Sequence, residues 1–155
     1  MGGGSWTKDA FTSYSNSVGR SVGLDGTMTS MDTSAQQMFR RRGIDPALKP
    51  YNAMRECRDT KEHPNTIPVI LALDVTGSMG SAAMAVAKKL NVIMTDLYNK
   101  VKDVEFMVMG IGDLAYDGAP IQASQFESDI RIAEQLDKIY FEGGGGGNAF
   151  ESYTA

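Results

Sequence analysis

The chain has 155 residues, of which 42% are hydrophobic and 22% charged, a composition that favours one compact domain over two. Its net charge of −4 argues against a protein that binds nucleic acid through bulk positive charge, and no apolar run is long enough for a membrane-spanning helix. We therefore expect neither a nucleic-acid partner nor a membrane partner. With a single cysteine and no recognisable secretory signal, the sequence predicts a cytoplasmic protein.

Residues 1–64 are predicted to form an N-terminal arm that is largely irregular. Residues 2–34 are rich in Gly, Ser, Thr and Asp, and no helical or strand period persists through them. One short helix is expected near residues 34–42, because Gly43 follows as a stop signal. Such an arm would gain its structure only on a partner.

Residues 65–155 carry the pattern of an α/β domain. The apolar run from Val69 to Leu73, closed by Asp74, predicts a strand that is buried on both faces. Apolar residues then recur every three or four positions from Ala83 to Val101, which is typical of an amphipathic helix. A second apolar run, Val104 to Met109, predicts the next strand. This order indicates a parallel strand–helix–strand unit.

The last part of the sequence predicts a loop with a short strand, a helix and a glycine-rich loop. The loop and short strand are expected over residues 111–123. Ser124 and Glu127 have the spacing of a capping box, which predicts that a helix begins there. Five glycines, Gly143 to Gly147, follow this helix and precede the start of another.

Asp74, Thr76 and Ser78 are the most informative residues of the sequence. They place one carboxylate and two hydroxyls at alternate positions, after a strand and before a helix, on a turn kept open by Gly77. Three oxygens that converge there suit a hard divalent cation, Mg²⁺ or Mn²⁺, with water completing the octahedron. The alternative interpretation is an aspartate that caps a turn.

This arrangement resembles the metal-ion-dependent adhesion site (MIDAS) of von Willebrand factor type A (vWA) domains, whose first motif is Asp-x-Ser-x-Ser. In this chain the motif is Asp74, Thr76 and Ser78, and the threonine keeps the hydroxyl. The resemblance covers residues 65–155. It implies a Rossmann-like, mostly parallel sheet flanked by helices, of which we expect the N-terminal half only, truncated at the C-terminus.

The resemblance also implies a second metal-binding loop, in which the family has a threonine after glycines and before a helix. Asn148 occupies the matching position, and Glu151, one helical turn further, is a second candidate. The alternatives are a flexible glycine hinge and a glutamate favoured by the helix dipole.

The family's third position, an aspartate after a later strand, has no match. Asp113 and Asp117 are interpreted as turn residues, so we expect the third ligand from outside the chain.

Three functions follow from these patterns. The vWA resemblance implies a metal-dependent protein–protein interaction module without catalysis, in which an acidic side chain of the partner completes the shell of the cation. The first alternative is a Mg²⁺-dependent phosphoryl-transfer enzyme of haloacid-dehalogenase type, although Thr76 stands where such enzymes have a second aspartate. The second is a structural subunit of a larger assembly. An incomplete sheet would expose an apolar strand edge and favour association through it.

Two further residues are interpreted as playing no chemical role. His63 has no second histidine or cysteine near it in the sequence, so we expect a surface loop histidine. No motif pairs Cys57 with a histidine, so we do not expect a catalytic thiol.

Overall fold

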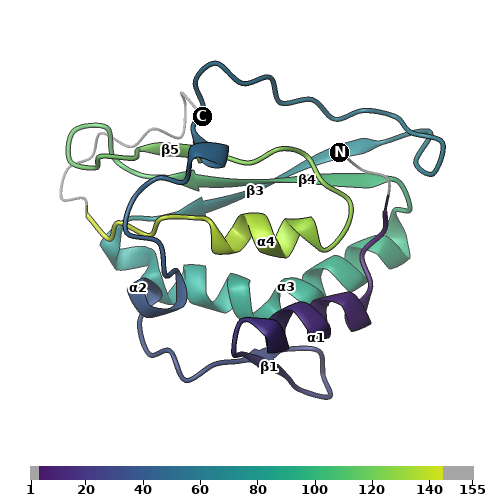
Figure 1. Ribbon diagram of the computed structural model, residues 1–155, viewed down its shortest axis with the longest axis horizontal. Helices are drawn as coiled ribbons and strands as arrows, with labels where there is room; N and C mark the ends of the chain where they lie inside the picture. Colours follow the sequence, from purple (N-terminus) through teal and green to yellow (C-terminus); the bar gives the residue numbers. More distant parts are fainter. Residues whose placement is uncertain (1–3, 145–155) are drawn as a thin grey trace.

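In the computed structural model, which describes residues 4–144, helices pack against a three-stranded sheet (Figure 1). The strands lie in the order β3 (Ile67–Asp74), β4 (Val104–Ile111) and β5 (Ile121–Ala123). β3 pairs with β4 in parallel, and β4 pairs with β5 in the antiparallel direction. The α/β class is therefore confirmed, with a mixed sheet. A larger Rossmann-like arrangement stays a prediction.

Helix α3 (Gly80–Lys100) connects the two parallel strands and lies along the sheet (Figure 1). Its buried residues recur every three or four positions because one face of the helix packs on the core. These residues are Ala83, Ala87, Leu90, Asn91 and Met94. The predicted amphipathic helix and parallel crossover are confirmed. Within residues 4–144, no helix is long and apolar enough to cross a membrane.

Strand β3 is an edge strand among the described residues, so the prediction that it is buried on both faces is wrong. Ile67 and Ile70 are 49% and 53% exposed, whereas all eight residues of β4 are buried. Val69 and Leu71 lie on the opposite face of the strand from Ile70 and pack against the core. A continuous apolar run does not by itself distinguish an edge strand from a central one. Association through this edge stays a prediction.

Ser124 and Glu127 pair with β4 instead of capping a helix, so the predicted capping box is wrong. The backbone N–H of Val108 donates to Ser124 Oγ at 2.9 Å, and Ser124 N–H donates to the Val108 carbonyl at 2.9 Å. Phe106 and Glu127 exchange two backbone hydrogen bonds. Because these bonds complete the edge of β4, helix α4 (Arg131–Asp137) begins later than expected.

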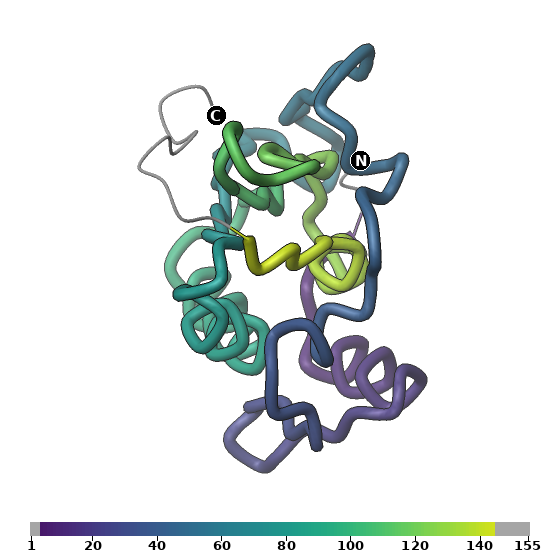
Figure 2. The backbone as a smooth tube through the Cα atoms, turned by 90° about the vertical axis from the view of Figure 1, so that its left-hand side faces the viewer, coloured from purple at the N-terminus to yellow at the C-terminus, as the bar shows by residue number. Residues whose placement is uncertain are grey.

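The N-terminal segment is folded onto the rest of the chain, so the prediction of a largely irregular arm is wrong for its first half. A ten-residue helix begins after Thr7, whose side chain accepts the backbone N–H of Ala10 at 3.2 Å. An antiparallel hairpin and two shorter helices follow (Figures 1 and 2). The elements are α1 (Lys8–Ser17), β1 (Ser21–Val22), β2 (Met28–Thr29), α2 (Ala35–Met38) and the 3-10 helix η1 (Pro46–Leu48). The helix expected near residues 34–42 is thus confirmed in place but shorter.

One hydrophobic cluster contains residues from both sides of the predicted boundary at residue 65. The indole ring of Trp6 lies 5.4 Å from the ring of Phe11, and Trp6 Nε1 donates to Asn91 Oδ1 of α3 at 3.0 Å. The N-terminal members of this cluster are Trp6, Phe11, Met28, Ala35, Met38, Phe39 and Leu48. The arm therefore forms part of the core in the single chain, contrary to the expectation that it orders only on a partner.

Partly buried polar contacts also join the N-terminal segment to later elements. The Arg20 guanidinium donates to Asp137 at 2.6 Å, and the Tyr14 hydroxyl donates to the same carboxylate at 2.6 Å. Burial, together with that carboxylate, raises the pKa of Tyr14 above its usual value.

His63 is only 4% exposed and contacts the Gly4 carbonyl at 2.9 Å, so the prediction of a surface histidine is wrong.

We predict that Phe11→Ala lowers the free energy of unfolding by about 3 kcal/mol or more, because a fully buried ring is removed from the shared core. Leu24→Ala is the matched control: that side chain is 101% exposed, and its loss is expected to change stability by less than about 0.5 kcal/mol. Urea denaturation measures both changes. Similar small effects for the two variants would show that the N-terminal segment is not part of the core.

Candidate functional site

The loop from Asp74 to Ser78 lies at the carboxyl end of β3, as predicted. Asp74 is the last residue of β3 and lies beside Ile111, the last residue of β4. The Val75 N–H donates to the Ile111 carbonyl at 2.9 Å, so the two strand ends stay joined where both loops leave the sheet. The 3-10 helix η2 (Gly77–Met79) then leads directly into α3. Asp74, Thr76 and Ser78 therefore precede the first turn of a long helix.

Asp74 and Thr76 contact each other directly. Asp74 Oδ1 accepts the backbone N–H of Thr76 at 2.8 Å and also accepts its hydroxyl. Both side chains are half-buried, whereas Ser78 is exposed on η2 and has no hydrogen-bond partner within residues 4–144. The structure thus brings Asp74 and Thr76 together and places Ser78 on the next turn. The aspartate caps its turn, which agrees with the alternative interpretation, and still offers its second oxygen.

The oxygen donors of this loop are of the kind that a hard cation prefers. One carboxylate and two hydroxyls are available at a strand end that water can reach. In the part of the chain that the structure describes, no three His, Cys, Asp or Glu side chains form a cluster able to hold a metal. A cation here would therefore depend on Asp74, the hydroxyls and water, with exchangeable positions.

The first two residues of the glycine run cross this loop. The Gly143 N–H donates to the Val75 carbonyl at 3.1 Å, and the Gly77 N–H donates to the Gly144 carbonyl at 2.9 Å. Gly143 has φ +71°, a conformation that favours glycine. The glycine run therefore begins against the predicted site. Asn148 and Glu151 lie outside the described residues, so both stay predictions.

Two side chains that the sequence reasoning missed hold this segment in place. Gln122 on β5 is fully buried, and its amide exchanges two hydrogen bonds of 2.8 Å with the backbone of Tyr140. The Glu142 carboxylate accepts the N–H groups of Gly118 at 3.0 Å and Ala119 at 3.2 Å. A glutamine inside a short predicted strand is the signal that could have indicated the first contact. These side-chain hydrogen bonds hold the segment from Tyr140 to Glu142 beside β5, where the described residues form no further strand.

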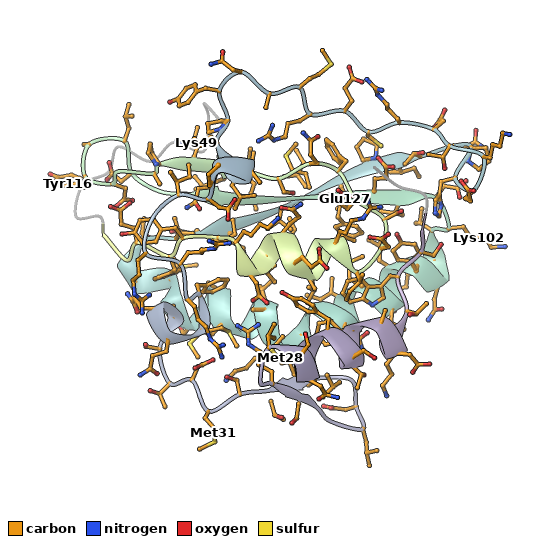
Figure 3. All side chains as sticks on the ribbon, viewed as in Figure 1. Met28, Met31, Lys49, Lys102, Tyr116 and Glu127 are labelled. Atoms are coloured by element: carbon orange, nitrogen blue, oxygen red, sulfur yellow. The ribbon has the colours of Figure 1, made fainter. Side chains whose placement is uncertain are left out.

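The loop that follows β4 lies at the same end of the sheet. Asp113 Oδ1 accepts the N–H of Ala115 at 2.9 Å, and Asp117 Oδ2 accepts the N–H of Asp113 at 2.7 Å. The prediction of turn residues is confirmed for both, although both are buried. Tyr116 is 62% exposed and points away from the fold (Figure 3).

Cys57 is a protonated thiol at neutral pH. Burial raises its pKa to about 12, and the hydrogen bond and charge of Glu105 add to this effect. Glu105 is itself buried on β4, where it accepts the backbone N–H of Arg58 at 3.2 Å. A nucleophilic thiolate would need the opposite environment, one that lowers the pKa.

A cavity of about 440 Å³ lies near the other end of β4, where Glu127 pairs with Phe106. The cavity does not involve Asp74. Its lining carries charges of both signs that pair with one another, such as Arg131 with Glu127 at 3.2 Å. The lining residues are Met54, Glu56, Arg58, Gln125, Glu127 and Arg131. We assign no function to this cavity.

Comparison of the chain with family models, curated proteins and solved structures finds no match. The vWA resemblance therefore stays a prediction, which rests on Asp74, Thr76, Ser78 and the strand–turn–helix context around them.

We predict that Gly77→Ala lowers the free energy of unfolding by about 1–3 kcal/mol, because the added Cβ would lie 2.7 Å from the Gly143 carbonyl oxygen. Gly43→Ala is the matched control, since a Cβ there meets nothing within 4 Å. Thermal denaturation compares the two variants. Equal stability of both would contradict the close approach of the glycine run to the Asp74 loop.

We predict that iodoacetamide alkylates Cys57 at pH 8 about a hundredfold or more slowly in the folded protein than in urea, because the raised pKa leaves little thiolate. The sign of the linkage follows from the same shift. The stability associated with this thiol is present below about pH 9 and is lost as the pH rises toward 12. Equal alkylation rates in the folded and unfolded protein would disprove this environment.

Proposed function

We propose that the chain is a metal-dependent protein-interaction module, in which Asp74, Thr76 and Ser78 bind Mg²⁺ or Mn²⁺. The observation that carries this proposal is the position of the three oxygen-bearing residues. They lie at the joined ends of β3 and β4, and the backbone of Gly143 and Gly144 forms hydrogen bonds with Val75 and Gly77, the residues that alternate with them. The topology thus brings two loops that are distant in sequence to one place.

The charge balance of the donor set favours an acidic partner. Among the direct ligands, Asp74 supplies one negative charge and the two hydroxyls supply none, so the ligands themselves neutralise only half of the positive charge of a dication. The bound cation would supply an open coordination position for a carboxylate. The partner feature that this site selects is therefore an exposed Asp or Glu side chain.

Exposed apolar side chains at the same end of the sheet support contact with a protein. Met79 on η2 is 39% exposed, and Leu114 and Tyr116 in the loop after β4 are 65% and 62% exposed. Exposed apolar groups beside a polar centre are typical of interaction surfaces. We therefore propose a partner that presents an acidic side chain flanked by apolar ones.

The proposal includes no catalytic role. A phosphatase of haloacid-dehalogenase type needs a second carboxylic acid two residues after its nucleophile, and Thr76 occupies that position. The hydroxyl of Thr76 donates to Asp74. We propose that Asp74 serves as a ligand rather than as a nucleophile.

We predict that one Mn²⁺ binds to the wild-type chain, as followed by electron paramagnetic resonance, and that Mg²⁺ displaces it. Asp74→Ala is expected to weaken binding about tenfold or more, because the only carboxylate of the donor set is lost. Asp96→Ala is the matched control: its carboxylate is 65% exposed on α3 and pairs with Lys100. Peptide display in the presence of Mg²⁺ then identifies the partner chemistry, with selected peptides expected to share an acidic residue.

Equal Mn²⁺ binding by the wild type and Asp74→Ala would disprove the metal site. Peptides that bind equally with Mg²⁺, with EDTA and to Asp74→Ala would disprove the metal-dependent interaction. Hydrolysis of p-nitrophenyl phosphate that depends on Asp74 would favour the enzyme instead.

A further inference from the structure

The loop after β4 contains a buried carboxylate oxygen that has no partner. Asp117 is 7% exposed, and its Oδ2 accepts the N–H of Asp113 at 2.7 Å. Its Oδ1 is enclosed and makes no hydrogen bond within residues 4–144. An enclosed carboxylate oxygen is strongly unfavourable unless a donor or a cation faces it. The turn itself uses only one of the two oxygens, so the role of Asp117 in the turn does not explain the second.

Two glycines make room for this carboxylate. A Cβ at Gly112 would lie 2.4 Å from Asp117 Oδ2, and a Cβ at Gly144 would lie 2.2 Å from Oδ1. Either side chain would displace the carboxylate. The oxygen without a partner is therefore directed at Gly144. This glycine belongs to the segment that forms hydrogen bonds with the loop from Asp74 to Ser78.

Gly144 connects Asp117 to that loop. Its carbonyl accepts the Gly77 N–H at 2.9 Å, and Gly77 stands between Thr76 and Ser78. Asp117 Oδ1 and the loop from Asp74 to Ser78 thus contact the same glycine from different parts of the chain. This juxtaposition exists because the loops after β3 and β4 leave the same end of the sheet.

We propose that Asp117 is the second carboxylate of the cation site and acts on the cation through its negative charge, across Gly144. This inference rests on the proposed function. Asp117 Oδ1 is enclosed against Gly144, so Asp117 acts through its charge and not as a direct ligand. Carboxylates outside the ligand shell of a metal ion add negative charge that favours binding of the cation.

The proposal gives the Asp117→Asn variant two effects of opposite sign. Without metal, the amide replaces a buried carboxylate of which one oxygen has no partner, and its own oxygen can still accept the Asp113 N–H, so the variant becomes more stable. With metal, the negative charge that attracts the cation is lost, so binding weakens. A carboxylate that served only the turn would not produce this pair of effects.

The test measures melting temperature in EDTA and the dissociation constant for Mn²⁺ alone, in the wild type, Asp117→Asn and the exposed control Asp96→Asn. We expect Asp117→Asn to melt about 2–4 °C higher in EDTA and to bind Mn²⁺ about tenfold or more weakly. The control is expected to match the wild type in both. Gly144→Ala is a second variant, which displaces Oδ1 without removing its charge and is also expected to weaken Mn²⁺ binding.

Wild-type Mn²⁺ affinity in Asp117→Asn, or a lower melting temperature in EDTA, would overturn the inference. If Asp74→Ala loses Mn²⁺ while Asp117→Asn retains it, only the role of Asp117 fails. If the wild type itself binds no Mn²⁺, or binds it as Asp74→Ala does, the proposed function fails, and this inference fails with it.

Discussion

The parallel pairing of β3 with β4 is the constraint on which the candidate site depends. The two strands match from Ile67 beside Val104 to Asp74 beside Ile111, and a parallel pair needs a crossover such as α3. Their carboxyl ends therefore meet at one edge of the sheet. Asp74 and the loop that carries Asp117 become neighbours for this reason, although more than 35 residues separate them in the sequence.

A buried glutamine and a half-buried glutamate bind the chain segment that lies beside the short sheet. Gln122 and Glu142 bind backbone groups of Tyr140, Gly118 and Ala119, so the chain returns to the sheet end without forming a strand there. The contact of Gln122 satisfies a buried amide that would otherwise be costly. The contacts of both side chains also fix where the glycine run begins. The site is thus assembled from three chain segments, each positioned by hydrogen bonds rather than by apolar packing alone.

The sequence predicted the parts of the fold that have a strong local period. The strand–helix–strand unit and the place of Asp74, Thr76 and Ser78 follow from apolar spacing. The N-terminal helix α1 was missed because its buried apolar anchor is one residue, Phe11, in a polar sequence. The capping-box prediction was wrong because Ser124 and Glu127 form hydrogen bonds with β4 instead. Such tertiary competition leaves no local signal, and neither does the unpartnered oxygen of Asp117.

The central claim is that a divalent cation binds at the end of β3. Anomalous diffraction from crystals soaked in Mn²⁺ tests it most directly, because the position of the ion is measured independently of any partner. The account predicts a peak about 2.1 Å from a carboxylate oxygen of Asp74, with Thr76 and Ser78 beside it. The absence of a peak there at saturating Mn²⁺, with the loop in the same conformation, would contradict the account.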